Sequence, residues 1–159
     1  MHLKRHLSYA QGYLELGLLA EAAAELARIP PPDHESLEVF GLRSAVLHEQ
    51  KDWPQLAGVA HAFARRWPAE PSAWVTWAYA TRRAQTLDAA EKILLEGERH
   101  HPGEATIQFN LGCYACLRGD LTEARRRVDR AIELDAKFSE AAETDPDLAA
   151  LREPERDAR

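Results

Sequence analysis

The sequence is poor in cysteine and has no long hydrophobic run. Cys113 and Cys116 are the only cysteines among 159 residues, which argues against a small secreted domain held together by disulfides. No apolar stretch approaches the roughly 18 residues that a membrane-spanning helix needs. No small-residue cleavage site follows the N-terminus, so we predict no signal peptide. These observations predict a cytoplasmic protein with no membrane partner.

An excess of positive charge is also missing. The net charge is −6, which argues against a nucleic-acid partner bound through its phosphates. The sequence has no glycine-rich phosphate loop, no nucleophile motif, and no histidine pair at the spacing of a zinc protease. We therefore predict no enzyme activity, with no catalytic residue, no cofactor and no metal site.

A repeat with a period of 34 residues runs through the chain instead. Its four blocks begin near Leu3, Leu37, Pro71 and Ala105. The eighth place of each block holds a small residue, namely Ala10, Ser44, Ala78 and Gly112. The twentieth place holds Ala22, Leu56, Ala90 and Ala124, and the twenty-fourth holds Leu26, Ala60, Leu94 and Val128. Because two antiparallel helices approach closely only where facing residues are small, each block reads as a pair of helices.

This pattern resembles the tetratricopeptide repeat (TPR) family, in particular small bacterial stand-alone members. The matching residues are Ala10, Tyr13, Gly17 and Ala22 in the first block, Trp74, Ala78, Ala90 and Pro102 in the third, and Leu111, Gly112, Gly119, Ala124 and Ala131 in the fourth. The resemblance implies an all-α superhelix of four repeats forming a single domain over residues 1–159. The repeats span 3–36, 37–70, 71–104 and 105–138, and a C-terminal cap and tail span 139–159.

The pattern predicts the helices one by one. The expected pairs are 2–16 with 19–29, 35–50 with 53–66, 71–84 with 87–101, and 104–118 with 121–135. The second block departs from the family, because Arg43 and Leu56 stand where apolar and small residues are usual, so we expect irregular packing there. After the fourth repeat, Ser139 is expected to cap a short helix, and Leu148 and Leu151 to cover the open end of the stack.

The pair Cys113–x–x–Cys116 raises the possibility of a redox or metal site. Both residues lie late in a predicted helix, where the helix dipole opposes the thiolate. Residues three apart on a helix have Cβ atoms about 5–6 Å apart, which is too far for an unstrained disulfide. His100 and His101 are too distant to complete a zinc site. We therefore interpret the pair as lining a groove. Similarly, we interpret Arg125–Arg127 as a solvated face on which Glu123 pairs with Arg127.

In the family, the first helices of the repeats form a concave groove that binds peptides. The resemblance places eight residues in or beside it here, namely Val75, Tyr79, Arg82, Arg83, Phe109, Asn110, Cys113 and Cys116. No repeat has the Lys and Asn pair of the carboxylate clamp of chaperone adaptors, so we do not expect that mode of binding. An apolar and aromatic strip edged by arginines favours a peptide with hydrophobic anchors and an acidic group.

Our hypothesis is therefore a non-catalytic interaction module, or adaptor, for a protein or peptide partner. Three alternatives remain open at this point. The first is a secretion-type TPR chaperone, and the second is a thiol redox protein that uses Cys113 and Cys116. The third is a self-associating structural subunit, a possible homo-oligomer. The groove can also be filled by the chain's own C-terminal segment.

Overall fold

The computed structural model describes residues 2–31 and 33–153, and no strand occurs among them. The predicted all-α fold is confirmed. The helices are α1 (His2–Glu15), α2 (Leu19–Ala27), α3 (Leu37–Glu49), α4 (Trp53–Arg66), α5 (Pro71–Ala84), α6 (Leu87–His100), α7 (Ala105–Leu117), α8 (Leu121–Leu134), α9 (Phe138–Thr144) and α10 (Ala149–Arg152), with 3₁₀ turns η1 (Asp33–Glu35) and η2 (Pro146–Leu148). Each of the first eight helices ends within two residues of its predicted boundary.

Backbone contacts divide the chain into two compact units, which are described separately. Unit 1 is Met1–Thr86 and unit 2 is Leu87–Arg159. The boundary falls between the two helices of the third predicted repeat, and the single domain over residues 1–159 stays a prediction. No helix in the described ranges is both long and apolar enough to cross a membrane. The predicted tail beyond residue 153 lies outside the described residues.

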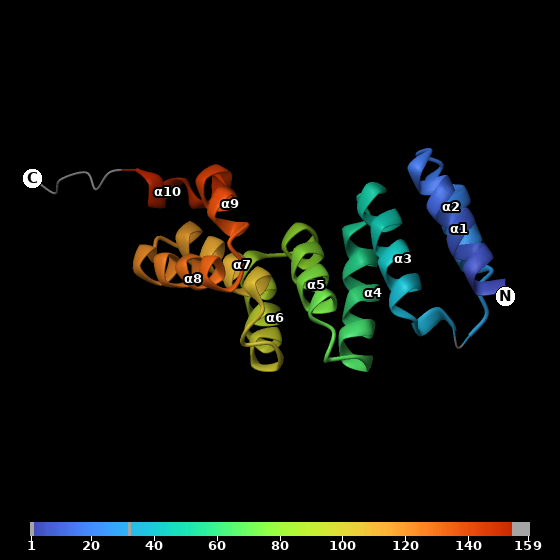
Figure 1. Cartoon of the computed structure of the whole chain (residues 1–159), viewed down its shortest axis with the longest axis horizontal. Helices are drawn as coiled ribbons and strands as arrows, with labels where there is room; N and C mark the ends of the chain where they lie inside the picture. Colours follow the sequence, from blue (N-terminus) through green and yellow to red (C-terminus); the bar gives the residue numbers. More distant parts are fainter. Residues whose placement is uncertain (1, 32, 154–159) are drawn as a thin grey trace, which may run out of the picture. The chain divides into compact units, whose positions relative to one another are not determined.

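Unit 1 contains α1 to α5, drawn from blue to green in Figure 1. Helix α1 packs on α2, and α4 packs between α3 and α5. The first repeat shares a core with α3, in which Ala10, Leu26 and Val46 are all buried. Leu47, Leu56 and Ala80 form a second core between α3, α4 and α5. The elements of unit 1 therefore follow the predicted order of helical pairs.

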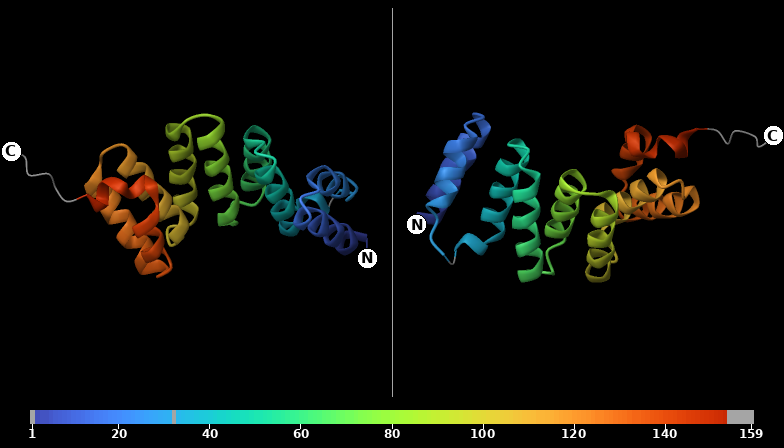
Figure 2. Two further views of the ribbon diagram at one scale, coloured as in Figure 1. Left: turned by 90° about the horizontal axis from the view of Figure 1, so that it is seen from above. Right: turned by 180° about the vertical axis from the view of Figure 1, so that it is seen from behind.

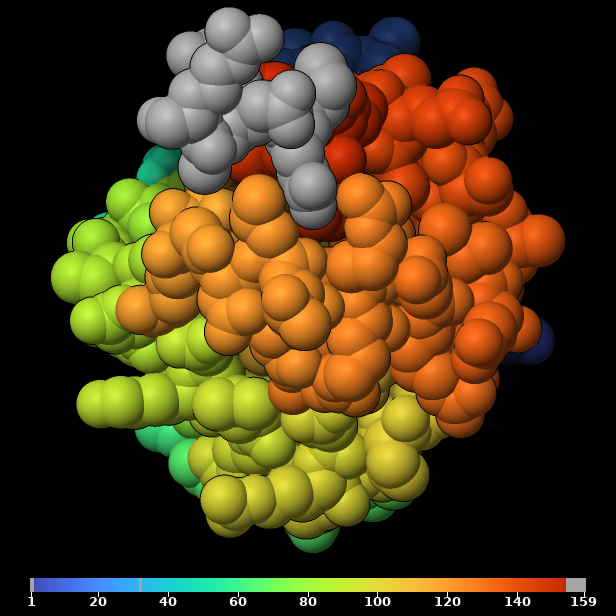
Figure 3. Space-filling model, turned by 90° about the vertical axis from the view of Figure 1, so that its left-hand side faces the viewer, coloured from blue at the N-terminus to red at the C-terminus, as the bar shows by residue number. Residues whose placement is uncertain are grey.

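Unit 2 contains α6 to α10. Helix α7 packs on α6 and α8, and it also contacts η2 and α10 near the C-terminal end of the chain. Figure 2 shows the red C-terminal segment lying against the orange helices of this unit, and Figure 3 shows its surface beside that of α8. Helix α7 is consequently buried on nearly every side. Its described neighbours leave Leu117 as the only exposed residue within its bounds.

The small residues of the repeat lie where the pattern predicts. Ala10, Ala22, Ala78, Ala90 and Ala124 are all fully buried, at 0% exposure. At Gly112 a Cβ atom would lie 2.9 Å from Val128 Cγ2 and 3.3 Å from the Ala124 carbonyl oxygen. Helices α7 and α8 therefore touch at a point where only glycine fits without displacement.

The turn between the two helices of a repeat uses left-handed backbone in three repeats. Gly17, Lys51 and Gly119 occupy the same place of the repeat and have φ of 72°, 56° and 84°. The helix after two of these turns begins at an aspartate, since Asp52 accepts from the Gln55 amide and Asp120 from the Glu123 amide. Glycine and aspartate at these places are therefore local signals for the hairpin.

One expected cap is wrong. Ser139 lies inside α9 and not at its start, because the helix already begins at Phe138 with Lys137 in the capping position. A turn at Asp135 precedes it, in which the Asp135 side chain accepts from the Lys137 amide. Helix α9 ends at Thr144, directly before Asp145–Pro146, and the Asp145 side chain caps η2 by accepting from the Asp147 amide. Leu148 is buried at 1% exposure, as expected of a residue that covers the stack.

Candidate functional site

The eight predicted groove residues fall on two helices of two different units. Val75, Tyr79, Arg82 and Arg83 lie on α5 in unit 1, and Phe109, Asn110, Cys113 and Cys116 lie on α7 in unit 2. Each group is described within its own unit.

On α5, Tyr79 belongs to a cluster of rings that three helices contribute. The imidazole of His48 from the end of α3 lies 5.5 Å from the Tyr79 ring, and its Nε2 lies 3.2 Å from the Tyr79 hydroxyl. Trp53, at the start of α4, lies 5.9 Å from Tyr79 and 5.3 Å from His48, both edge to face. These separations are typical of stabilising aromatic pairs.

Arg83 completes this cluster. Its guanidinium carbon lies 3.4 Å from the centre of the Tyr79 ring and 5.3 Å from that of Trp53. Its Nη1 donates to the Tyr79 carbonyl oxygen at 3.3 Å. His48 and Arg83 are exposed, while Trp53 and Tyr79 are half-buried. We refer to His48, Trp53, Tyr79 and Arg83 as the α5 cluster; a second molecule can reach it.

Of the other predicted residues on α5, Val75 and Arg82 are half-buried. Sequence reasoning missed Trp53, because it begins a second helix and those helices were not expected to contribute to the groove. The helical hairpin itself would have indicated Trp53, because the turn places the start of α4 next to the end of α3. A ring at the first position of α4 must lie near the end of α3, where His48 occupies the twelfth place of its repeat.

The group on α7 has the opposite environment. Phe109, Cys113 and Cys116 are buried, with exposures of 5%, 3% and 4%, and Asn110 is half-buried. The Phe109 ring lies 4.8 Å from that of Phe138, the first residue of α9. A partner cannot contact the three buried side chains in this conformation. Their role as partner-binding residues therefore stays a prediction that requires the C-terminal segment to move.

The segment that covers α7 comprises α9, η2 and α10, and its own hydrogen bonds give it a fixed shape. Arg152 donates from one nitrogen to the carbonyl oxygens of Ala142 and Asp145, at 2.9 Å each. Arg125 of α8 donates to the Leu151 carbonyl oxygen at 3.1 Å. The chain's own segment thus fills the face that Phe109, Cys113 and Cys116 present, one of the outcomes that the sequence left open.

Cys113 and Cys116 form no disulfide, and both are buried, so their thiols are shielded from a redox partner in this conformation. The segment brings Asp145 and Asp147 close to Cys113, so that the sulfur and one oxygen from each carboxylate lie within 4.8 Å of one another. Sequence reasoning considered only His100 and His101 as further ligands. The group mixes one soft and two hard ligands, and Asp145 already accepts a backbone hydrogen bond, so we base no metal site on it.

The predicted pair of Glu123 with Arg127 is confirmed, at 2.6 Å between Oε1 and Nε. The expectation of a solvated face is wrong for Arg127, whose side chain is only 11% exposed. Arg127 donates from Nη1 to Glu98 at 2.8 Å and to Gln108 at 3.0 Å, and Gln108 donates to Glu98 at 2.7 Å. The missed signal is Gln108, which replaces the ring that the other three repeats carry at the fourth place.

These hydrogen bonds change the pKa values of the Glu98 and Glu123 carboxyl groups. Burial raises the pKa of Glu98, but the hydrogen bonds from Arg127 and Gln108 outweigh burial, so that the pKa is lowered. The hydrogen bond from Arg126, aided by Arg127, lowers the pKa of Glu123 from 4.5 to about 2 against a smaller effect of burial. The network is therefore ionised at neutral pH and joins α6, α7 and α8.

No family model matches the sequence, and no curated protein matches it either. A structure of MamA, described as the RS-1 ArsTM double mutant, aligns with a TM-score of 0.69 at 18% identity, covering 84% of this chain and 75% of that chain. A second structure, MamA MSR-1 C2, gives 0.64 at 15% identity over 83% of this chain and 76% of that chain.

A third match is YrrB, described as a TPR protein with an unusual peptide-binding site. It aligns with a TM-score of 0.64 at 16% identity, covering 84% of this chain and 70% of that chain. At such identities the likeness bears on the fold alone. Because these neighbours are TPR proteins and the helices and small residues follow the 34-residue period, the chain has the tetratricopeptide repeat fold.

Proposed function

We infer that this protein is a non-catalytic interaction module that binds a peptide segment of a partner protein through the α5 cluster. The observation that carries this inference is the position of Arg83, held over the Tyr79 ring beside Trp53 on an accessible surface. The peptide-binding site in the description of YrrB, which has the same fold, supports a role of this class.

The residue types of the cluster suit protein recognition. Tryptophan, tyrosine and arginine are the side chains most enriched where interfaces hold most of their binding energy. Rings that already pack on one another lose little side-chain freedom when a partner binds. A guanidinium stacked on a ring keeps N–H groups in its plane free for a carboxylate. The cluster therefore provides both an apolar platform and a charged anchor.

The partner chemistry follows from this arrangement. A peptide with one or two hydrophobic side chains for Trp53 and Tyr79 and an acidic group for Arg83 matches the cluster. Val75 and Arg82, half-buried on the same helix, are the further contacts that we propose. The buried α7 residues have no part in this mode of binding.

Selection of peptides from a random 12-residue display library tests this function. Selected peptides are titrated by calorimetry against the wild type, Tyr79→Ala and Arg83→Gln. We expect each variant to weaken a peptide that binds the cluster by about 10-fold or more, since a lost hot-spot contact costs more than about 1.4 kcal/mol.

Two exposed residues provide matched controls. Tyr9 is 53% exposed on α1 and Arg99 is exposed on α6, so that Tyr9→Ala and Arg99→Gln make the same chemical changes elsewhere. Unchanged affinity of every selected peptide for both cluster variants would remove the α5 cluster from the account.

A further inference from the structure

Arg43 breaks the repeat on the surface of unit 1. It occupies the seventh place of its block, where the other three blocks have the large apolar or aromatic residues Tyr9, Trp77 and Leu111. Leu111 is buried at 2% exposure, and the Trp77 ring stacks on His61 at 4.2 Å. Arg43 is exposed instead. Tyr9 is 53% exposed on α1, so the seventh place is packed against a neighbouring helix in the third and fourth repeats but not in the first two.

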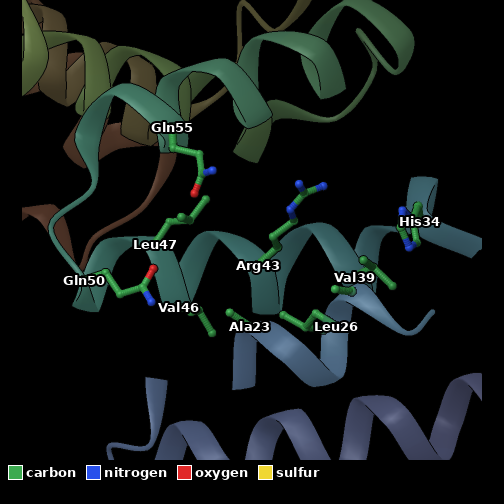
Figure 4. A pocket seen from close by; sticks show the side chains of 10 residues that line it. Ala23, Leu26, His34, Val39, Arg43, Val46, Leu47, Gln50 and Gln55 are labelled. Carbon is green, nitrogen blue, oxygen red and sulfur yellow. The ribbon is translucent and has the colours of Figure 1, made fainter. Parts of the chain in front are cut away.

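Two adjoining hollows lie beside Arg43. One, of about 280 Å³, is lined by α2, α3 and the start of α4, with Leu26 and Val46 among its apolar residues. The other, of about 550 Å³, is lined by η1, α3 and α4 and reaches Trp67. Both are bordered by His34 and Arg43. Figure 4 shows Arg43 extending from α3 away from Ala23 and Leu26, with Gln55 and His34 toward opposite ends of the first hollow.

Polar groups without partners stand at the junction of the two hollows. The His34 Nε2 atom is buried and has no hydrogen-bond partner among the residues that the structure describes. The Arg43 guanidinium likewise makes no hydrogen bond or ion pair within residues 2–31 and 33–153. Buried polar atoms are rarely left unsatisfied in folded proteins, because removing them from water without a hydrogen bond is costly. The buried His34 ring nitrogen and the exposed Arg43 guanidinium therefore face the hollows together, where both can hydrogen-bond a carboxylate of a bound molecule.

The walls of the second hollow suit an apolar side chain. Phe40 and Phe63 stack at 4.2 Å and are buried beneath it. Trp67 is 42% exposed, with the Arg66 guanidinium 4.8 Å from its ring. The entrance to the second hollow is open at Gly58, where an added Cβ atom would meet no atom within 4 Å. The second hollow is thus aromatic at its base and open at its rim.

We propose that these two hollows form a second peptide-binding groove, separate from the α5 cluster. The peptide places an aspartate or glutamate carboxylate on Arg43 and His34, one apolar side chain against Leu26 and Val46, and another against Phe63 and Trp67. Charge complementarity favours an acidic segment, because Arg43 and Arg66 border the groove and Glu35, its one acidic side chain, is already paired with Arg66 at 3.3 Å. A single small acid fills only one hollow, whereas a peptide fills both.

The test uses the same random 12-residue library on the full chain, with counter-selection against Arg43→Leu. Leucine removes the guanidinium at this exposed position of α3 and restores an apolar residue there, so we expect this variant to unfold at the same temperature as the wild type or higher. Peptides enriched on the wild type should contain an acidic residue between apolar ones and bind Arg43→Leu at least about 10-fold more weakly. Arg5→Leu makes the same change at an exposed position of α1 and should leave their affinity unchanged.

A second variant blocks the groove without touching charge. Ala62 is exposed on α4 and lines the second hollow, so that Ala62→Trp should weaken the same peptides while the fold persists. The proposal is overturned if no selected peptide discriminates against Arg43→Leu, or if Ala62→Trp binds them as well as the wild type. These outcomes would not bear on the proposed binding at Tyr79 and Arg83, because the α5 cluster is tested with its own variants.

Discussion

The ninth and twelfth places of the third and fourth repeats lie in opposite surroundings. Tyr79 and Arg82 hold these places on α5 and are half-buried, while Cys113 and Cys116 hold them on α7 and are both under 5% exposed. The helices are equivalent in the repeat, yet only α7 is followed by a segment that turns back onto it, with Phe138 against Phe109. A place in the repeat therefore predicts where a side chain points, and the rest of the chain decides whether a partner can reach it.

The two units also differ in charge. Residues 1–86 hold nine acidic and nine basic side chains, so the whole net charge of −6 falls on residues 87–159, with seventeen acidic and eleven basic side chains. Unit 1 thus provides exposed arginines on a neutral background, and unit 2 is acidic and covers α7 with its own C-terminal segment. An acidic partner is favoured at unit 1 and repelled by unit 2.

The largest difference between α7 and α5 should appear when a ring is removed from each. Phe109→Ala deletes a buried ring and should lower the free energy of unfolding by about 3–5 kcal/mol. Tyr79→Ala loses only partly exposed ring contacts, worth about 0.5–1.5 kcal/mol. Urea unfolding followed by circular dichroism measures both. Equal losses would mean that α7 is no better covered than α5.

Replacing glycine by alanine on α7 and on α3, the first helices of two repeats, should change the free energy of unfolding in opposite directions. Gly112→Ala forces a Cβ atom to within 2.9 Å of the stiff side chain of Val128 and should destabilise the protein by about 1–3 kcal/mol. Gly41→Ala on α3 meets no atom within 4 Å and should stabilise by about 0.4–1 kcal/mol. Thermal unfolding reports each sign. A neutral Gly112→Ala would show that α7 and α8 are not in close contact.

The polar network of unit 2 should make stability depend on pH in acid. Because the pKa of Glu123 is lowered from 4.5 to about 2 in the fold, its contribution is complete above pH 4.5 and is lost as the pH falls toward 2. The side chain is 34% exposed, so solvent screening limits this contribution to about 1 kcal/mol. Glu123→Gln should flatten the unfolding free energy over that interval. An unchanged slope would contradict the network.

The smallest change in unfolding free energy is expected when an ion pair of unit 1 is removed. Glu35 and Arg66 form an ion pair at 3.3 Å with both side chains more than half exposed. Such pairs contribute about 0–1 kcal/mol, so Glu35→Gln should change the unfolding free energy by less than about 0.5 kcal/mol. Chemical denaturation at low and high salt checks this value. A larger loss than that of Glu123→Gln would reverse the comparison of the units.

Most of the fold was predictable because its causes are local and periodic. Small residues stand at the eighth place of all four blocks and at the twentieth place of three, and glycine or aspartate marks the turn in the first, second and fourth blocks, so that the helix ends follow from them. The covering role of Leu148 was also predictable, because an exposed repeat end needs apolar residues to close it. The start of α9 was misplaced because the turn at Asp135 gave a stronger signal than the capping preference of Ser139.

The site was less predictable, because its environment depends on pairs far apart in the sequence. Nothing local to Phe109 indicates that it meets Phe138, and nothing local to Tyr79 indicates that it remains accessible. The sequence around Arg127 is typical of a surface residue, and its partners Glu98 and Gln108 come from two other helices. Arg43 was recognised as irregular, but the hollows that it borders are also lined by residues of α2, η1 and α4, which are distant in the sequence.

Amide chemical shifts of the full chain, followed by NMR while a selected peptide is added, test the central claim most directly. The claim is that a partner binds the open helix α5 while α7 remains covered by the chain's own segment. We predict shift changes at residues 75–83 and at His48 and Trp53, with those of residues 105–117 and 138–152 unchanged. Changes concentrated on α7 and on the segment that covers it, with α5 unaffected, would contradict the account.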